Sequence, residues 1–281
     1  MRKKVGSFIT GIEKGVLMDY RTINQDLWNK KTEVHYTSDF YDVDGFKEGE
    51  DSLNSIELAL LGDLTGKAIL HLQCHFGLDT ISLARHGAIP TGVDFAEQAI
   101  KKARRLNAET RTNATFIHSD VYDLPQVLDQ QFDMVFTSYG VLGWLPDMRR
   151  WAEVVHHFLR PGGRLVLVEF HPVVWMFDSG FQRITYPYDS PEPIVEEEEG
   201  TYAEPDVPLK ATSVGWNHGL ATVLNALMTT GLVLGDIQEY SYSPYDCFDN
   251  TVQVGERTYQ VKGLEDKIPM LYSVVMEKSL S

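Results

Sequence analysis

The alternation of short apolar segments with amphipathic segments between residues 68 and 170 is the feature that most constrains the fold. Apolar residues such as Ala96, Ala99, Ile100 and Ala103 recur at helical spacing, while lysines and arginines occupy the other faces. Strands that alternate with helices through short connections form right-handed crossovers and a parallel sheet. The five expected strands are residues 68–72, 89–93, 114–118, 133–137 and 164–170.

Two further strands, at residues 234–242 and 270–276, complete the predicted sheet. A helix precedes them, which we expect Asn217 to cap and Gly231 to end. The sequence therefore predicts an α/β fold with a doubly wound, seven-stranded, mostly parallel, Rossmann-like sheet.

Two regions do not follow this repeat. Residues 1–60 mix aromatic and charged residues and are predicted to form an N-terminal helical cap on a main domain of residues 61–281. Residues 172–215 are rich in proline, tyrosine and acid, and we predict a β-rich lid inserted after the fifth strand. Within it, Glu196–Glu199 is interpreted as a solvated hairpin edge rather than a metal site.

The composition excludes several classes of protein. The 281 residues carry a net charge of −15, which repels phosphate backbones and disfavours nucleic acid as a partner. Cys74 and Cys247 cannot form a disulfide framework, and no Cys/His cluster indicates structural zinc. The chain has no apolar signal core and no apolar run of about 18 residues. We expect a soluble, cytoplasmic monomer or homodimer with no metal and no membrane partner.

The segment from the first expected strand to the second is typical of a nucleotide-binding unit. Gly77 lets the backbone approach a ligand at the start of a helix. Asp94 ends the second strand, where an acid commonly accepts hydrogen bonds from both ribose hydroxyls. The alternative for Asp94 is a helix N-cap. In doubly wound sheets the ligand lies beyond the carboxyl ends of the strands, and all these residues occupy such ends.

Five motifs in order resemble those of the class I S-adenosylmethionine-dependent methyltransferases: "LHLQCHFG", "VDF", "HSDVYDLP", "FDMVFTSYGVLGWLPD" and "LRPGGRLVLVEFHP". The resemblance covers roughly residues 60–172 and resumes in the last two strands. It implies S-adenosyl-L-methionine as cofactor, with Asp120 on the adenine amino group and Val121 or Tyr122 against the ring. The cofactor contacts that it implies are His71, Gln73, Cys74, Gly77, Asp94, Phe95, Asp120, Val121 and Ser138.

The first motif departs from the family pattern. His71 stands where the family usually has an acid, and Gln73 and His75 stand where it usually has glycines. Gln73 could bind the amino or carboxylate group of the methionine portion directly. The absence of G-x-G-x-x-G argues against a nicotinamide enzyme. His71 and His75 lack the third ligand that a metal site would need.

Methyl transfer requires mainly alignment and exclusion of water, and a base only where the nucleophile is protonated. Candidate catalytic residues at the strand ends are Tyr139 and His171, with His218 at the start of the helix after the lid. His35 or Tyr36 of the cap could reach the same place. Aromatic residues near these motifs favour a closed pocket for a small acceptor. They are Trp28, Tyr36, Tyr41, Trp144, Trp175 and Trp216.

The sequence therefore predicts a methyltransferase that acts on a small molecule, with the acceptor atom left open. Two alternatives remain at this point. One is another enzyme on the same fold, such as a dehydrogenase or an aminopropyl transferase. The other is a non-catalytic protein that binds S-adenosylmethionine as a sensor or scaffold.

Overall fold

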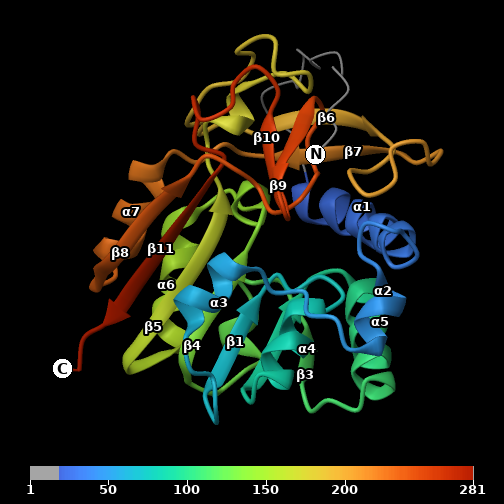
Figure 1. The fold of residues 1–281 in the computed structure, drawn as a ribbon. Coiled ribbons are helices and arrows are strands. Elements are labelled where there is room, and N and C mark those ends of the chain that lie inside the picture. The colour runs from blue at the N-terminus through green and yellow to red at the C-terminus, as the bar shows by residue number, and fades with distance from the viewer. Residues whose placement is uncertain (1–18, 281) are drawn as a thin grey trace.

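A seven-stranded sheet forms the centre of the protein in the computed structural model, which describes residues 19–280 (Figure 1). The strand order is β3-β2-β1-β4-β5-β11-β8, and β11 is antiparallel to both neighbours while the other pairs are parallel. The doubly wound, mostly parallel sheet is therefore confirmed. Its strands are β1 Ala68–Leu72, β2 Ile89–Asp94, β3 Thr115–His118, β4 Phe132–Ser138, β5 Leu159–Phe170, β8 Leu232–Tyr240 and β11 Leu271–Lys278.

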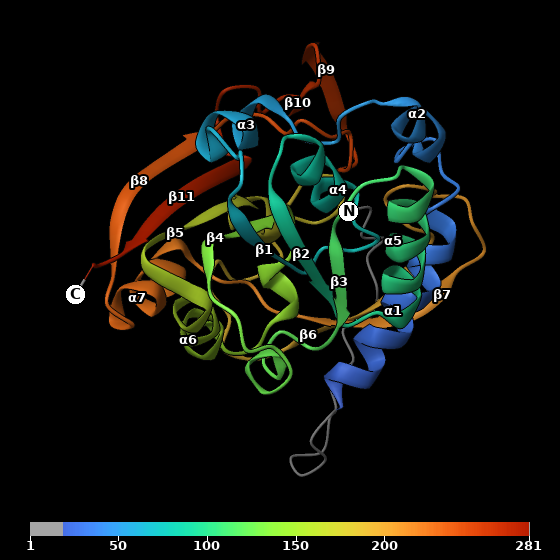
Figure 2. The same ribbon diagram turned by 90° about the horizontal axis from the view of Figure 1, so that it is seen from below.

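Helices cover both faces of this sheet, which explains why its central strands are apolar along their length. In Figure 2, α6 and α7 lie on one side of the strands, and α3 and α4 lie on the other. Trp151 and Phe158 of α6 are fully buried in the core on the first side, and Leu83 of α4 is fully buried on the second. These helices, with α5 beside β3, are α3 Ser55–Leu61, α4 Leu78–Arg85, α5 Glu97–Glu109, α6 Met148–Phe158 and α7 Leu220–Thr229.

The N-termini of α6 and α7 differ in whether a side chain caps the helix. Asp147 caps α6 by accepting a hydrogen bond from the Arg150 backbone N–H at 3.0 Å. Asn217 was predicted to cap α7, and this is wrong, because α7 begins at Leu220 with Gly219 as its N-cap. The Asn217 side chain donates instead to the carbonyls of Trp175 and Pro187.

The cap before the sheet consists of α1 Tyr20–His35 and α2 Val43–Glu48, followed by α3. Asn24 of α1 pairs with the backbone of Val214, donating to its carbonyl at 2.8 Å and accepting from its N–H at 3.0 Å. This pair joins the cap to the segment inserted after β5. No helix within residues 19–280 is both long and apolar enough to cross a bilayer.

The insertion after β5 holds a short 3₁₀ turn, Val174–Met176, and an antiparallel hairpin of β6 Ile194–Glu199 and β7 Lys210–Gly215. The glutamate run forms the end of β6, but it is not solvated throughout. Glu196 is buried and accepts a hydrogen bond from Tyr186, whereas Glu198 pairs with Lys31. Glu197 accepts from Thr212, and Glu199 pairs with Lys210.

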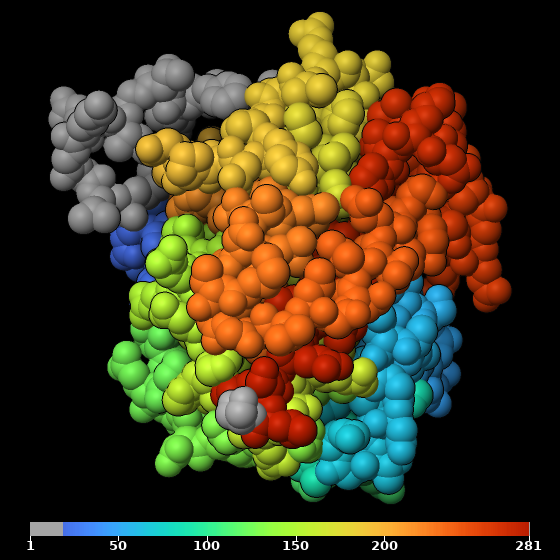
Figure 3. Space-filling model, turned by 90° about the vertical axis from the view of Figure 1, so that its left-hand side faces the viewer, coloured from blue at the N-terminus to red at the C-terminus, as the bar shows by residue number. Residues whose placement is uncertain are grey.

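A second insertion, residues 241–270 between β8 and β11, was not anticipated from the sequence. It contains the hairpin of β9 Thr251–Gly255 and β10 Thr258–Val261. Figure 3 shows that this segment (red) adjoins the first insertion (yellow) on one face of the molecule. We call the cap (residues 19–54) and the two insertions (residues 171–219 and 241–270) the covering layer, because they lie over the carboxyl ends of the strands (Figure 1).

Candidate active site

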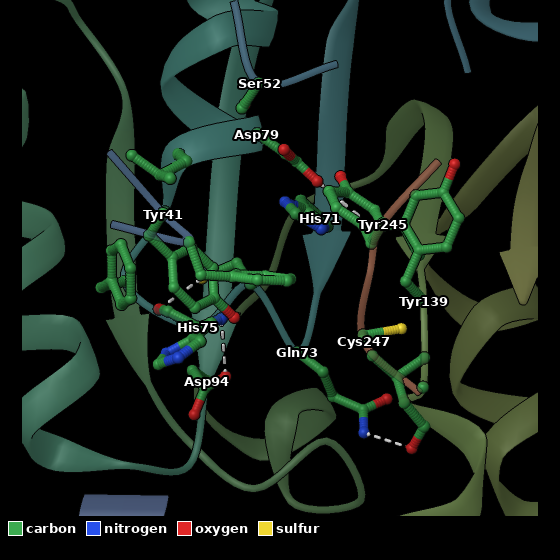
Figure 4. Close-up of a pocket in the computed structure, with 18 of the residues that line it drawn as sticks. Tyr41, Ser52, His71, Gln73, His75, Asp79, Asp94, Tyr139, Tyr245 and Cys247 are labelled. Carbon is green, nitrogen blue, oxygen red and sulfur yellow. Dashed lines mark hydrogen bonds between the residues drawn. The ribbon is translucent and has the colours of Figure 1, made fainter. Parts of the chain in front are cut away.

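A cavity of about 450 Å³ lies between the carboxyl ends of β1, β2 and β4 and the covering layer (Figure 4). This volume falls within the range of small-molecule sites. The covering layer contributes many aromatic side chains to its wall, while the sheet and the loops after its strands contribute polar and apolar residues in about equal numbers. From the covering layer, the wall includes Trp28, Phe40, Tyr41, Trp175, Tyr202, Tyr245, Cys247 and Arg257.

Most of the predicted cofactor contacts line this one cavity. They are His71, Gln73, Cys74, Gly77, Asp94, Phe95 and Ser138. The structure does not bring Asp120 and Val121 to its wall. The Asp120 carboxylate lies 3.4 Å from Arg21 of α1, which covers that end of the sheet, and Val121 is buried in the core beneath α6. Of the predicted aromatic residues, Trp28, Tyr41, Trp144 and Trp175 line the cavity, whereas Tyr36 and Trp216 do not.

The loop after β1 has an unusual backbone. Gln73 and His75 have φ angles of 55° and 50°, the left-handed region that side chains rarely adopt outside functional sites. Gly77 has φ of 82°, and a Cβ there would lie 2.5 Å from the Phe116 ring, so only glycine fits. The Gln73 side chain donates to the Val141 carbonyl at 2.9 Å. Its Oε1, like Nδ1 of His75, is buried without a hydrogen-bond partner among residues 19–280.

Asp94 connects the ends of β1 and β2. Its two carboxylate oxygens accept hydrogen bonds from the backbone N–H groups of His75 and Ala96, both at 2.8 Å. Ala96, not Asp94, is the N-cap of α5, so the helix-cap alternative does not describe the structure. Burial raises the pKa of Asp94 to about 6. Each carboxylate oxygen keeps a further lone pair, so Asp94 can also accept from ligand hydroxyls.

The histidines near the cavity are neutral. Burial lowers the pKa of both His71 and His75 to about 3. Nδ1 of His71 lies 2.8 Å from Oγ1 of Thr80, and Nε2 of His75 lies 3.0 Å from Nδ1 of His35. Neither imidazole is suited to take a proton near neutral pH. Residues 19–280 contain no group of three or more His, Cys, Asp or Glu side chains arranged to hold a metal ion.

A buried carboxylate that the sequence interpretation missed shapes the loop after β4. Glu169 of β5 is 3% exposed and accepts from the backbone N–H groups of Gly140, Val141 (2.9 Å), Leu142 (3.0 Å) and Phe170 (2.7 Å). These bonds hold the turn formed by Tyr139 and Gly140. Gly140 has a left-handed backbone, with φ of 77°. One acid in an otherwise apolar strand was the sequence signal for this role.

Tyr139, predicted as a catalytic candidate, does line the cavity at the end of β4. Its hydroxyl is buried without a hydrogen-bond partner among residues 19–280, and the carboxyl group of Glu57 of α3 acts on it electrostatically. Figure 4 shows this hydroxyl turned away from the side of the cavity where His75 and Asp94 lie. Burial raises the pKa of Tyr139 well above its usual value and that of Glu57 to about 7.

The other two catalytic candidates lie outside this cavity. Nε2 of His171 is 2.8 Å from the Glu239 carboxylate of β8, and its Nδ1 accepts from the Val173 N–H at 3.2 Å. Nε2 of His218 lies 2.7 Å from the Leu145 carbonyl. Both imidazoles are thus engaged in contacts that hold the start and the end of the first insertion. The prediction that they face the ligand is corrected by this placement.

The second insertion supplies wall residues that no motif indicated. Tyr245 lines the cavity, and its hydroxyl accepts from Asn54 at 2.9 Å. Cys247 and Arg257 belong to the same segment. Asp79, in the first turn of α4, also faces the cavity, and its carboxylate lies 3.3 Å from Oγ of Ser138. Its position directly after the first motif was the available signal.

Comparison with known proteins bears on this site. Residues 70–165 match a family model described as "Methyltransferase domain". The chain is 32% identical to an uncharacterized methyltransferase of Synechocystis sp. over 46% of its own length and 59% of that protein. It is 30% identical to a ubiquinone biosynthesis O-methyltransferase of Coxiella burnetii over 55% of its own length and 61% of the relative. The alignments thus span about 60% of these relatives.

The fold comparison covers more of the chain. An S-adenosylmethionine-dependent methyltransferase structure from Clostridium acetobutylicum superimposes with a TM-score of 0.57 and 12% identity, covering 90% of this chain and 99% of the other. The sheet order and the site at its carboxyl edge define the class I methyltransferase fold. Residues 70–165 therefore match a methyltransferase domain in sequence, and the chain around them has the fold of the class I methyltransferases.

Proposed function

We propose that this protein transfers a methyl group from S-adenosyl-L-methionine to a small-molecule acceptor held between the sheet and the covering layer. The observation that carries the proposal is the polar wall made by the loop after β1. There, Oε1 of Gln73 and Nδ1 of His75 are buried without partners, beside the carboxylate of Asp94. Buried polar atoms of this kind are expected to find partners in a ligand.

The residues present fit the cofactor. Asp94 would accept from the ribose hydroxyls, Phe95 would pack near the base, and Gln73 would bind the amino-acid portion, assisted by Ser138. His71, Cys74 and Gly77 complete that side of the wall. The bound cofactor supplies an already activated methyl group on a sulfonium.

The protein's contribution is alignment and exclusion of water rather than acid–base chemistry. No imidazole that lines the cavity takes a proton near neutral pH, because burial keeps His71 and His75 neutral. Tyr139 retains its proton, because burial raises its pKa well above the usual value, and it is proposed to position the acceptor with its ring. Tyr41 and Tyr202, joined by a short hydroxyl–hydroxyl hydrogen bond, close the cavity from above.

The covering layer supports a small, partly apolar acceptor. Its wall is mainly aromatic, and Arg257 is the one cationic residue among those that line the cavity within residues 19–280. Acidic residues also line it, so an acceptor with several negative charges would be repelled. A cavity with this lining suits a neutral or cationic molecule that has an aromatic or aliphatic body.

A radiolabelled methyl donor incubated with the protein and a fractionated metabolite extract tests this function. We expect label in a small-molecule fraction, and much less label at the same donor concentration when Asp94→Ala replaces the wild type. Thermal shift with S-adenosylhomocysteine and with NAD separates a methyltransferase from a dehydrogenase. Stabilisation by S-adenosylhomocysteine without transfer to any fraction would favour the non-catalytic alternative, and stabilisation by NAD alone would contradict the proposal.

A further inference from the structure

One carboxylate in the cavity wall has no cationic partner. Asp79 makes no ion pair with any of residues 19–280, and its hydrogen-bond partners are the hydroxyls of Ser52 and Ser138. Arg257 lines the same cavity and acts on Asp79 only through space, without an ion-pair contact. Figure 4 shows Asp79 near His71 and Tyr245, on the opposite side of the site from Asp94.

The other acids of the wall are accounted for. Asp94 binds two backbone N–H groups, and Asp51 lies 2.5 Å from His86. Asp42 caps α2 and is exposed, as is Glu50, so water compensates both charges. Asp79 is only partly exposed and lies where aromatic side chains displace water. A charge in such a place is costly unless a cation accompanies it.

The position of Asp79 also relates it to the proposed cofactor. It lies two residues after Gly77, on the helix that begins where the loop after β1 ends. Burial raises the pKa of Asp79, and the N-terminus of the helix acts in the opposite direction by favouring the ionised carboxylate. His71, next to it in the wall, is a neutral imidazole. It therefore does not provide the negative charge that an acid at its position would provide. Asp79 is therefore the carboxylate that follows the loop after β1 in the chain and lines the cavity without a backbone N–H or a cation bound to it, whereas Asp94 is bound by two backbone N–H groups.

We propose that Asp79 binds the ammonium group of the amino-acid portion of the methyl donor. This inference deepens the proposed function and rests on it. An ammonium group offers three donors, and a carboxylate next to a serine hydroxyl is suited to accept from it. An amine on the acceptor molecule would present the same chemistry, so the experiment distinguishes the two sources.

Calorimetric titration with S-adenosylhomocysteine and with its deaminated analogue, which lacks only the amino group, tests the proposal. In the wild type we expect the analogue to bind about ten- to a hundredfold more weakly, the range of a charge-assisted hydrogen bond. In Asp79→Asn we expect the affinity for S-adenosylhomocysteine to fall by a similar factor, and the affinity for the analogue to equal that of the wild type. Asp79→Glu, which keeps the charge, should recover part of the loss.

Asp26→Asn is the control, because it removes one negative charge at a carboxylate that is exposed, paired with Lys30 and outside the cavity wall. It should leave both affinities within about threefold. Equal affinity of the wild type for both ligands would overturn the proposal without any variant. So would an Asp79→Asn protein that loses both ligands equally, or one that binds both normally and loses turnover only with an amine acceptor. A wild type that binds neither ligand would instead contradict the proposed function.

Discussion

The sheet side and the covering side of the cavity are held in place by different kinds of contact. On the sheet side, backbone N–H groups hold the carboxylates of Asp94 and Glu169. On the covering side, side chains from distant segments hold one another, as in Lys31 with Glu198 and Asn54 with Tyr245. The sheet-side contacts are made by the loops that follow β1, β2 and β4, whereas these covering-side contacts each join two segments that are distant in the chain.

We therefore expect changes on the two sides of the cavity to affect different properties of the protein. Changes on the sheet side should act on folding and on cofactor affinity, because the loops there are formed before the ligand arrives. Changes on the covering side should act on turnover, because they alter how the acceptor is aligned and how water is excluded. The following predictions test that division, from the largest expected effect to the smallest.

Replacing residues 180–210 with a short flexible linker should have the largest effect. It removes Tyr202 from the cavity wall and Glu198 from Lys31. We expect turnover to fall about a hundredfold or more. Affinity for S-adenosylhomocysteine should stay within about tenfold, since the cofactor rests on the sheet. The same deletion with Lys31→Met controls for the unpaired buried cation, and undiminished turnover in either protein would show that the first insertion has no part in acceptor binding.

Glu169→Gln should cost the most stability of any single change discussed. The amide nitrogen would face backbone N–H groups that now donate to the carboxylate. We expect the free energy of unfolding to drop by about 3 kcal/mol, measured by denaturant titration. Glu239→Gln, at a side chain 53% exposed, is the control with a small expected effect. Equal losses in the two variants would contradict the role assigned to Glu169.

Asp94→Ala should weaken S-adenosylhomocysteine binding by about 2–3 kcal/mol, or tens- to a hundredfold. The ionised carboxylate is the form that accepts from hydroxyls, and its pKa is about 6 in the free protein. Affinity should therefore be full above pH 6 and decrease as the pH falls through 6, by at most about tenfold per unit. Asp94→Asn should lack this dependence. A pH profile shared by the wild type and Asp94→Asn would assign the titration to another group.

His218→Ala should have the smallest effect, because the imidazole faces the Leu145 carbonyl and not the cavity. We expect the free energy of unfolding to fall by about 1 kcal/mol and turnover to stay within about twofold. Steady-state kinetics and thermal unfolding measure the two quantities. A large loss of turnover without a loss of stability would indicate that His218 acts in catalysis, as the sequence predicted.

The sequence predicted the parts of the molecule that depend on local pattern. Strand and helix periodicity located the sheet, and the motifs at the strand ends located eight residues of the cavity wall. The side-chain direction of His171 could not be predicted, since it depends on a turn at Val173 and on Glu239 of a distant strand. The second insertion escaped notice because its short strands lack a clear period, and Tyr245 reaches the cavity only through tertiary contacts.

The ion pair of Lys31 with Glu198 affects how much free energy it costs to separate the cap from the hairpin of the first insertion. Lys31 is 1% exposed on its side chain, and its ammonium lies 2.6 Å from the carboxylate, near the rings of Trp28 and Trp144. When the hairpin separates from the cap, the lost attraction is largely offset by hydration of both charges. An apolar contact of the same size would have no such compensation and would resist separation more strongly. A buried ion pair therefore gives a contact that is specific in its register and costs little free energy to separate, which suits the acceptor entry and product release that the proposed function needs.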